Sequence, residues 1–278
     1  MQDRTIVAAK AKIGSAPLLL VDRPLAGVAL VTMNRPDTRN SLSLDMIDRM
    51  HSRFTRLAAD RTVYAIVLAA NGPVFCAGHD LKELTAHRAD ADKGLAFYTE
   101  AMTRCSAMMQ AIVACPKPVI AAVQGTATAA GCQLVATCDL AVAADTAKFC
   151  TPGVNIGLFC STPMVALSRN VGRKRAMEML LIGDMLSAAD AADYGIVNRV
   201  VAPGQVLDEA LSLAGKIAGK SPLTVAMGKA AFYAQAEMPL KDAYAYAAKV
   251  MVDNMMARDA EEGISAFLDK RKPEWKGS

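Results

Sequence analysis

The sequence predicts an α/β core followed by a helical C-terminal unit, and three observations lead to this fold class. Strand-like and helix-like segments alternate over the first two thirds of the 278 residues. Only helical patterns follow residue 205. With 53% apolar residues, the chain can bury one large core together with a smaller appended unit. We therefore expect a core over residues 1–204, with residues 1–16 disordered, and a helical domain over residues 205–278.

The expected strands are short runs of β-branched or other apolar residues, bounded by turn residues. The run at 64–72 ends in an Asn-Gly turn, and the run at 118–123 follows two closely spaced prolines. The full set of expected strands covers residues 27–34, 64–72, 118–123, 140–145, 147–153 and 195–202.

The expected helices have apolar residues at helical spacing. In the core they cover residues 43–60, 95–115 and 129–139, and further helical patterns begin near residue 161. Four strongly amphipathic segments fill the chain from residue 205 to the end. The last two have wide apolar faces that a monomer of this size does not readily bury, which favours contacts between subunits.

Composition excludes several classes of function. The net charge is +4 and the basic residues are scattered, so we expect no nucleic-acid partner. The apolar runs are too short for a membrane span, and we see no signal peptide. Seven cysteines without a C-x-x-C motif indicate reduced thiols and a cytoplasmic protein. The three histidines have no metal-ligand spacing, so we expect no metal site.

Two stretches of small residues each lead from a strand into a helix. The first is AGHD at 77–80, and the second is VQGTATAAGCQL at 123–134. The first N–H groups of a helix have no partner inside the helix and carry partial positive charge. Two such helix ends that face one another would direct two N–H donors at one carbonyl oxygen. This arrangement is an oxyanion hole, which stabilises an enolate or a tetrahedral intermediate.

Together these stretches resemble the crotonase superfamily, also called the enoyl-CoA hydratase/isomerase superfamily, over nearly the whole chain. VTMNRPDTRNSLS at 31–43 is similar to the N-terminal signature of that family. PVFCAGHDLKEL at 73–84 resembles its first oxyanion-hole loop, and residues 117–145 resemble the second. Residues 149–158 and 262–275 resemble the later parts of the family pattern.

The resemblance implies a fold and an assembly. The fold is a spiral of ββα turns with a helical C-terminal trimerisation domain, and the assembly is a homotrimer or a dimer of trimers. Within the family, AGHDLKEL and GLFCSTP are most similar to the branch of the enoyl-CoA hydratase domain-containing proteins, type 3.

The resemblance also implies the substrate and the residues around it. Family members bind an acyl-CoA or enoyl-CoA thioester and need no separate cofactor. The catalytic oxyanion donors fall on the backbone N–H groups of His79 and Ala130. Phe267 and Lys270 match residues that close over CoA, often from a neighbouring subunit. The other implied substrate-binding residues are Ala77, Asp80, Leu81, Lys82, Gln133 and Gly153.

Two positions depart from the family pattern. Hydratases of the family use two glutamates to hold and activate water, and these positions are Gln133 and Gly153 here. An amide does not titrate, and glycine has no side chain. General acid–base assistance raises the rate by about 10²–10⁴-fold per group, so we expect the rate of hydration to be very low.

The roles of several side chains stay open. The ring of His79 either acts as an acid or base or plays no part beside its backbone N–H. Asp80 is either a catalytic group or, as we favour, a helix cap. Cys132 and Cys160 are expected to be buried and inert. Glu83 and Glu100 are either substitute acids or surface residues, and we favour the surface.

Two functions remain open at this point. The first is an acyl-CoA enzyme that stabilises a thioester enolate, with another group in place of the glutamates. The second is a non-catalytic protein that binds acyl-CoA. A dinucleotide oxidoreductase is excluded because no G-x-G-x-x-G follows the first strand.

Overall fold

Two mostly parallel sheets organise the protein in the computed structural model, which describes residues 16–278. The expected disorder of the N-terminus therefore falls almost wholly outside the described residues. In the larger sheet, β1 is antiparallel to β2, and every later pair is parallel. The strands in spatial order are β1 (Leu19–Leu25), β2 (Val28–Met33), β3 (Ala65–Ala70), β5 (Val119–Val123), β7 (Leu140–Ala144) and β10 (Arg199–Val201).

The smaller sheet takes the second strand of each turn of a spiral. Its order is β4 (Val74–Cys76), β6 (Thr126–Thr128), β8 (Lys148–Cys150) and β9 (Leu186–Ser187). The chain thus alternates between the sheets as β3–β4, β5–β6 and β7–β8, and helices follow each pair. These helices are α2 (Leu81–Ala86) and α3 (Leu95–Ala114), then α4 (Ala130–Thr137), then α5 (Pro163–Asn170) and α6 (Arg173–Ile182). The expected spiral of ββα turns is confirmed.

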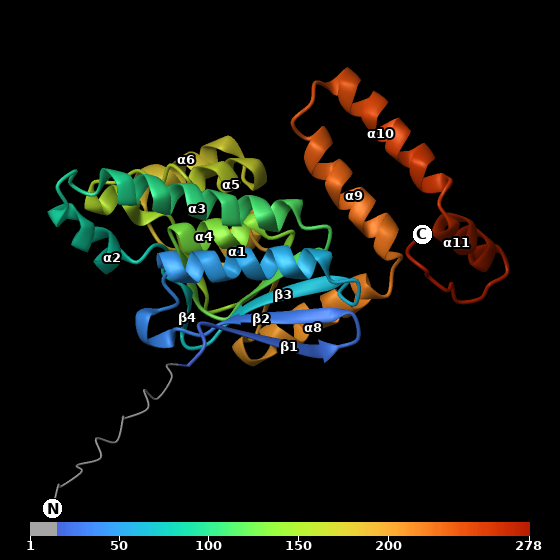
Figure 1. Ribbon diagram of the computed structural model, residues 1–278, viewed down its shortest axis with the longest axis horizontal. Helices are drawn as coiled ribbons and strands as arrows, with labels where there is room; N and C mark the ends of the chain where they lie inside the picture. Colours follow the sequence, from blue (N-terminus) through green and yellow to red (C-terminus); the bar gives the residue numbers. More distant parts are fainter. Residues whose placement is uncertain (1–15) are drawn as a thin grey trace, which may run out of the picture.

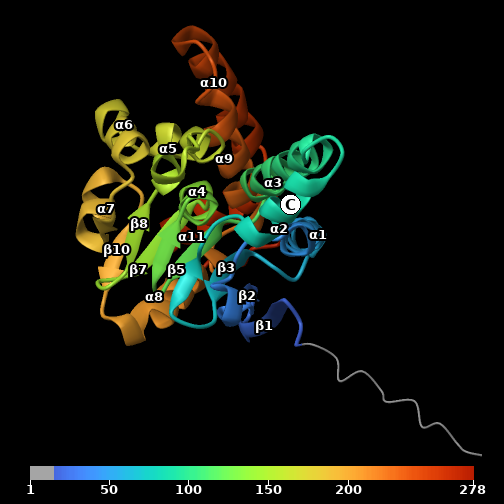
Figure 2. The same cartoon turned by 90° about the vertical axis from the view of Figure 1, so that its left-hand side faces the viewer.

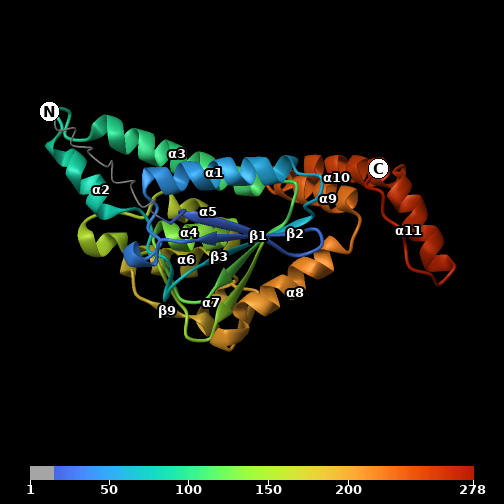
Figure 3. The same cartoon turned by 60° about the horizontal axis from the view of Figure 1, so that its bottom comes forward.

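Helices cover both faces of the larger sheet (Figures 2 and 3). Helix α8 (Val206–Ala218) packs against one face, on β2, β3, β5 and β7. Helices α1 (Leu44–Ala59), α3 and α4 lie on the other side, where α1 packs against α3. Because both faces are covered, the central strands are continuous apolar runs rather than alternating ones.

The last three helices project from this core (Figure 1). They are α9 (Pro222–Gln235), α10 (Leu240–Met255) and α11 (Arg258–Leu268). Helix α11 packs mainly against α9 and α10. The helical domain was expected to begin at residue 205. The apolar face of α8 lies on the sheet instead, so the projecting part begins with α9. Within residues 16–278, no helix is long and apolar enough to cross a membrane.

The C-terminal tail returns to the projecting helices through one buried carboxylate. Asp259 accepts hydrogen bonds from the Ser221 hydroxyl at 2.6 Å and from the N–H groups of Lys276 and Gly277 at 2.8 and 3.0 Å. Burial by itself raises the pKa of Asp259, but these hydrogen bonds outweigh burial and the pKa is lowered. The carboxylate therefore ties the start of α11, the start of α9 and the chain end together.

Four strands were not expected from the sequence, namely β1, β4, β6 and β9, and the strand expected over 195–202 is confined to Arg199–Val201. β4, β6 and β9 have two or three residues, which are too few for an alternating pattern. β1 has seven residues, and its sequence LLVDRPL contains charged residues and a proline rather than a clear strand pattern. Helix α7 (Ala188–Tyr194) lies between β9 and β10, within the region expected to be mostly helical.

Candidate functional site

The two loops singled out in the sequence leave neighbouring strands of the smaller sheet. β4 and β6 are parallel, and Cys76 pairs with Ala127 in their register. Because both strands end at the same edge of the sheet, the chain emerges from them side by side. One loop leads into α2 and the other leads directly into α4. The expectation that these two helix ends meet is therefore met by the topology.

Two glycines allow the loops to touch. Gly78 has a φ of +83°, and a methyl group there would lie 3.0 Å from the carbonyl oxygen of Thr128 and 3.1 Å from the nitrogen of Ala130. A methyl group at Gly131 would lie only 2.2 Å from the carbonyl oxygen of Cys76. The first turn of α4 thus rests on the backbone of β4, and any side chain at Gly131 would separate them.

The N–H groups of His79 and Ala130 are both available to a ligand. Within residues 16–278, neither group donates a hydrogen bond to the protein. Ala130 is the first residue of α4, so its N–H has no partner one turn earlier. Leu42 fixes the backbone on both sides of His79, because its N–H donates to Gly78 at 2.8 Å and its carbonyl accepts from Asp80 at 3.3 Å. The two predicted oxyanion donors are brought together.

The residue before the second donor has a strained backbone. Ala129 adopts φ 51° and ψ −120°, a region that residues with a side chain rarely occupy. Its N–H donates to the carbonyl of Cys150 at 2.9 Å, which holds the strained conformation in place. Strain of this kind costs on the order of 1–3 kcal/mol and persists where surrounding structure enforces it, often at functional sites.

The ring of His79 lies inside the protein instead of pointing to solvent. Its Nε2 atom is buried and has no hydrogen-bond partner in the described chain. Burial lowers the pKa of His79 below the ordinary 6.5, although a hydrogen bond with the Leu42 backbone opposes the shift. The imidazole is therefore neutral at pH 7, with one nitrogen unpartnered.

Gln133 lies one helical turn beyond the second donor. Its N–H donates to the carbonyl of Ala129 at 3.0 Å, so its side chain shares a helix face with Ala129 and Ala130. The residue is only 4% exposed, and its Oε1 atom has no partner among residues 16–278. Buried polar atoms are nearly always hydrogen-bonded in native proteins, so this amide and the ring of His79 are each able to bond to a water molecule or a ligand.

Gly153, where the family resemblance predicts the second glutamate position, has no room for any side chain. It lies in a 3-10 helix over Pro152–Ile156 and is buried. A methyl group there would lie 2.6 Å from the carbonyl oxygen of Leu158 and 2.9 Å from the Sγ atom of Cys160. The backbone at Leu158 and the side chain of Cys160 therefore leave no room for a side chain at residue 153.

The remaining residues of the first loop have distinct positions. The N–H of Ala77 donates to the carbonyl of Arg39 at 3.0 Å. Asp80 caps α2 as favoured, because its Oδ1 accepts from the N–H groups of Lys82 and Glu83 at 3.0 and 3.3 Å. The side chains of Leu81 and Lys82 are exposed on α2, beside the donor loop.

The two candidate substitute acids are engaged elsewhere. Glu83 accepts a hydrogen bond from the N–H of Leu44 at 3.0 Å and so stabilises the start of α1. Glu100 forms an exposed ion pair with Arg104 on α3. Neither carboxylate is left as an unpaired acid at the donor loops.

Phe267 and Lys270 are not brought to the donors within one chain. Phe267 is 82% exposed at the end of α11, and Lys270 follows it in the exposed tail. In Figure 1, α11 lies at the opposite end of the molecule from α2. A role for these two residues at the site requires a second subunit.

All seven cysteines are free of disulfide bonds and buried. Burial is the main cause that raises the pKa of every thiol, to about 12 for Cys76 and Cys105. Cys132 and Cys160, next to the site, are therefore uncharged and unreactive at pH 7, as expected. The described part of the chain also contains no group of three or more His, Cys, Asp or Glu side chains suited to a metal ion.

Sequence reasoning missed a buried ion pair behind α4. Lys229 donates to Asp139 at 2.7 Å and to the carbonyls of Ile112 and Lys117 at 3.1 and 3.3 Å. The hydroxyl of Tyr233 donates to the same carboxylate at 2.9 Å, and burial, then the negative charge of Asp139, raises the pKa of Tyr233. The three side chains join α9 to the C-terminal end of α4. Because Asp139 is far from the other two in the sequence, no local sequence pattern predicts their contact.

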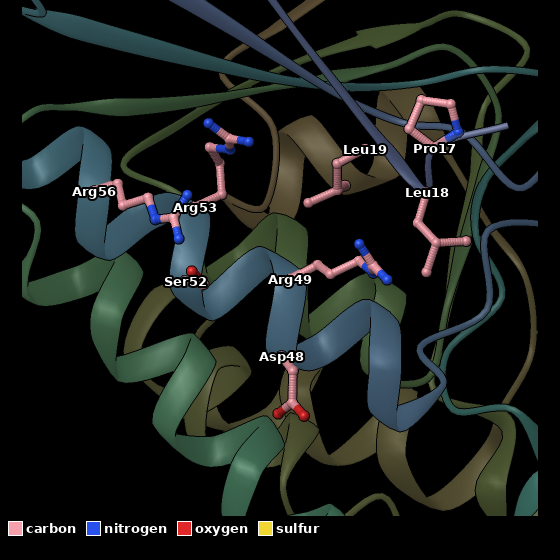
Figure 4. Close-up of a pocket in the computed structure, with 8 residues that line it drawn as sticks. All are labelled: Pro17, Leu18, Leu19, Asp48, Arg49, Ser52, Arg53 and Arg56. Carbon is pink, nitrogen blue, oxygen red and sulfur yellow. The ribbon is translucent and has the colours of Figure 1, made fainter. Parts of the chain in front are cut away.

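A separate groove of about 380 Å³ lies between the start of β1 and α1 (Figure 4). None of the predicted site residues lines it. The lining residues are Pro17, Leu18, Leu19, Asp48, Arg49, Ser52, Arg53 and Arg56.

Comparison with known proteins places this geometry in context. The family model for enoyl-CoA hydratase/isomerase matches residues 24–278. The mitochondrial enoyl-CoA hydratase domain-containing protein 3 of Rattus norvegicus is 46% identical over 261 residues, which are 94% of this chain and 85% of the rat protein. Its Homo sapiens counterpart is 47% identical over 253 residues, which are 91% of this chain and 82% of the human protein.

Solved structures agree with these sequence matches. The crystal structure of an enoyl-CoA hydratase from Mycobacterium smegmatis is 53% identical, with a TM-score of 0.89 over 94% of this chain and 99% of that one. The structure of the human enoyl-CoA hydratase domain-containing protein 3 is 46% identical, with a TM-score of 0.88 over 93% of this chain and 100% of that one. The resemblance to this branch, noted from AGHDLKEL and GLFCSTP, is confirmed.

Proposed function

Because the chain belongs to the enoyl-CoA hydratase/isomerase family, we propose that it is an enzyme that binds an acyl-CoA thioester and stabilises its enolate. The thioester oxygen accepts hydrogen bonds from the N–H groups of His79 and Ala130. The observation that carries this proposal is the contact of Gly78 with Ala130, which sets the two free donors side by side. Removal of one donor from such a site typically costs about 10²–10³-fold in rate.

The CoA moiety lies along the first loop in this proposal. Ala77, Asp80 and Leu81 border it through the backbone, and the exposed ammonium group of Lys82 contacts a phosphate as a point charge. Phe267 and Lys270 reach CoA from a neighbouring subunit, since they lie far from the donors of their own chain. CoA is part of the substrate, and no further cofactor is invoked.

The assembly that we propose is a homotrimer or a dimer of trimers. It is supported by the large apolar side chains that α9, α10 and α11 expose to solvent. These are Phe232, Leu240, Tyr244, Met251, Val252, Met255, Met256, Ile264, Phe267 and Leu268. A cytoplasmic location stays a prediction from the reduced thiols, while the animal relatives are named mitochondrial proteins.

We expect hydration of a simple enoyl-CoA to be slow. Gln133 cannot exchange a proton, and the backbone at Leu158 fills the space beside Gly153. The same observation favours a second candidate function, a non-catalytic acyl-CoA binding protein. The two candidates differ in whether disturbance of the donors lowers turnover or affinity alone.

The test is hydration of crotonyl-CoA and of a medium-chain enoyl-CoA, followed through loss of the conjugated-thioester absorbance, with a crotonase as positive control. Calorimetric titration with the saturated esters runs in parallel. We expect binding of the esters and turnover far below that of the control. Turnover equal to the control would overturn the claim that Gln133 and Gly153 disable hydration, and absence of binding would overturn the proposal itself.

A further inference from the structure

Three arginines line the groove in Figure 4 along one face of α1. They are Arg49, Arg53 and Arg56, which follow one another at the spacings that place side chains on the same side of a helix. Arg53 is half-buried, and within residues 16–278 neither Arg53 nor Arg56 takes part in an ion pair. Two guanidinium groups therefore have no acidic partner in the described part of the chain.

The carboxylates close to these arginines are already paired. Asp45 accepts a hydrogen bond from the Nε of Arg49 at 2.7 Å. Asp48, the one acidic residue that lines the groove, pairs with Arg104 on α3 at 2.5 Å. The groove therefore has an excess of positive charge, and an acidic group is the complementary ligand.

The opposite wall of the groove is the start of β1, the edge strand of the larger sheet. The N–H of Asn34 donates to the carbonyl of Leu18 at 2.8 Å, and Leu19 pairs with Met33 in the register of β1 and β2. Hydrogen-bonded and non-hydrogen-bonded pairs alternate between antiparallel strands, so the N–H and C=O groups of Leu19 and Val21 point away from β2. No described strand pairs with this outer edge.

The free edge is short and lies beside the arginines. Its regular part ends after Asp22, where the register shifts and Pro24 follows. Helix α1 packs against β1, and the two run side by side in Figures 1 and 3. In Figure 4 the side chain of Arg49 extends from α1 toward Leu18. A strand added to this edge therefore runs along the arginines.

An extended acidic chain fits both features. Side chains on one face of an extended strand repeat about every 6.7 Å. Along α1 the rise is about 6 Å from Arg49 to Arg53 and about 4.5 Å from Arg53 to Arg56. Carboxylates on alternate residues of an added strand thus come opposite successive guanidinium groups. A single phosphate needs donors that converge on one point, whereas these cations are spread along a line.

The first fifteen residues of the chain itself do not match this charge. They contain Arg4, Lys10 and Lys12 against one acidic residue, Asp3. Their net charge has the same sign as that of the groove, so the two repel one another. The complementary occupant is an acidic segment of another protein.

We propose that the outer edge of β1 and the arginines of α1 form a docking surface for an extended acidic segment of a partner protein. The segment adds a strand to β1 and its carboxylates pair with Arg53 and Arg56. Its apolar side chains contact Pro17 and Leu19, which line the same groove. None of the residues of the thioester site lines this groove, so the inference does not depend on the proposed function.

The probe is a fluorescent peptide of about eight residues in which glutamate and valine alternate. Its binding to the full chain is followed by fluorescence anisotropy. A peptide with glutamine in place of glutamate removes the charge and keeps the length. Two further peptides carry N-methyl groups on the glutamates alone or on the valines alone, which removes the backbone donors from one side of the strand at a time.

On the wild-type chain, the glutamate peptide should bind about tenfold or more tightly than the glutamine peptide, because its contacts with the guanidinium groups are charge-assisted. One of the two N-methylated peptides should lose about tenfold or more in affinity, and the other should keep its affinity, because only one side of the added strand faces β1.

The double variant Arg53→Glu/Arg56→Glu should weaken binding of the glutamate peptide about tenfold or more. Arg173→Glu/Lys174→Glu is the matched control, since both residues are exposed at the start of α6 and the change in net charge is the same. It should alter the affinity by less than about twofold. Binding of butyryl-CoA, titrated on the same proteins, should be equal in both variants and in wild type, which separates this surface from the thioester site.

Equal affinity for the glutamate and glutamine peptides, or full binding of both N-methylated peptides, would overturn the proposal on the wild-type chain alone, whether or not a variant folds. Equal weakening by the two double variants would also overturn it. Binding of tripolyphosphate without binding of the peptide would assign the groove to a small polyanion instead. A changed sedimentation coefficient of Arg53→Glu/Arg56→Glu without peptide would assign the edge to a second copy of this chain. Either of these last two results would overturn the proposal.

Discussion

The ammonium group of Lys229 on α9 lies 2.7 Å from the carboxylate of Asp139, directly after α4. Both side chains are largely buried, at 7% and 15% exposure. Loss of one partner of a buried pair leaves the other charged and unpaired, which costs about 3–5 kcal/mol. This pair is therefore the main polar link between the core and the projecting helices.

Lys229→Met should lower the free energy of unfolding by about 3 kcal/mol or more, because Asp139 keeps its charge but loses its cation. Urea unfolding followed by circular dichroism measures this. Lys249→Met is the control, since Lys249 pairs with Asp253 at 2.6 Å in an exposed i,i+4 pair that is worth less than about 0.5 kcal/mol. Equal effects of the two substitutions would show that the buried pair carries no special weight.

Gly131→Ala should destabilise the protein by about 1–3 kcal/mol and should also weaken thioester binding. The added methyl group meets the Cys76 carbonyl oxygen at 2.2 Å, so α4 must move away from β4 and carry the donor at Ala130 with it. Thermal unfolding and ester titration measure the two effects.

The matched control for Gly131→Ala is Gly228→Ala. Gly228 lies inside α9, where a methyl group would meet nothing within 4 Å. This change should stabilise the helix by up to about 1 kcal/mol and leave ester binding unaltered. A Gly131→Ala protein that behaved like Gly228→Ala would disprove the close packing of α4 on β4.

Stability should fall as the pH falls below about 6.5, and the ring of His79 should account for part of the loss. Burial lowers the pKa of His79 in the folded chain, so the unfolded chain takes up the proton first. The contribution is complete above pH 6.5 and decreases toward the folded pKa, by at most about 1.4 kcal/mol per pH unit.

His79→Gln should flatten the pH dependence of unfolding over this range. His51→Gln is the control, because His51 is exposed on α1. Urea midpoints at several pH values between about 7.5 and 5.5 give the two slopes. If the urea midpoint of His79→Gln depends on pH as steeply as that of wild type, the ring of His79 is exposed to solvent and the prediction is wrong.

Glutamates placed at residues 133 and 153, the positions that the family resemblance predicts for them, should fail to give fast hydration. Gln133→Glu alone fits the existing side-chain volume, but Gly153→Glu drives its Cβ to 2.6 Å from the Leu158 carbonyl oxygen. We expect the double variant to unfold at lower urea concentration and to hydrate crotonyl-CoA no faster than Gln133→Glu. Gly204→Ala, where a methyl group meets nothing, controls for glycine replacement. A large gain in rate by the double variant would show that the loop opens readily.

The sequence was sufficient for the parts of the fold that rest on local patterns. The apolar stripe of α1, at Met46, Ile47, Met50, Phe54 and Leu57, is buried as its helical spacing requires. The three-residue strands β4 and β6 have no such signal. They form because parallel neighbours and the turns between them fix their backbones.

The candidate site was predictable to a similar degree. The N–H groups of His79 and Ala130 meet because two strand-to-helix loops, recognisable in the sequence, leave adjacent strands. The closure of the backbone over Gly153 and the pairing of Asp139 with Lys229 were not predictable. Both depend on contacts between chain segments whose geometry only the packed structure defines.

Because all seven thiols are buried, their rate of chemical labelling reports unfolding of the chain. A folded molecule presents no accessible thiolate to an alkylating dye, whereas an opened one releases several from the interior of the core. Cys115 and Cys138 flank the carboxylate that anchors α9, so early labelling there reports departure of the projecting helices. Labelling of Cys76 and Cys132 reports opening of the donor loops, and the order of labelling gives the sequence in which the molecule comes apart.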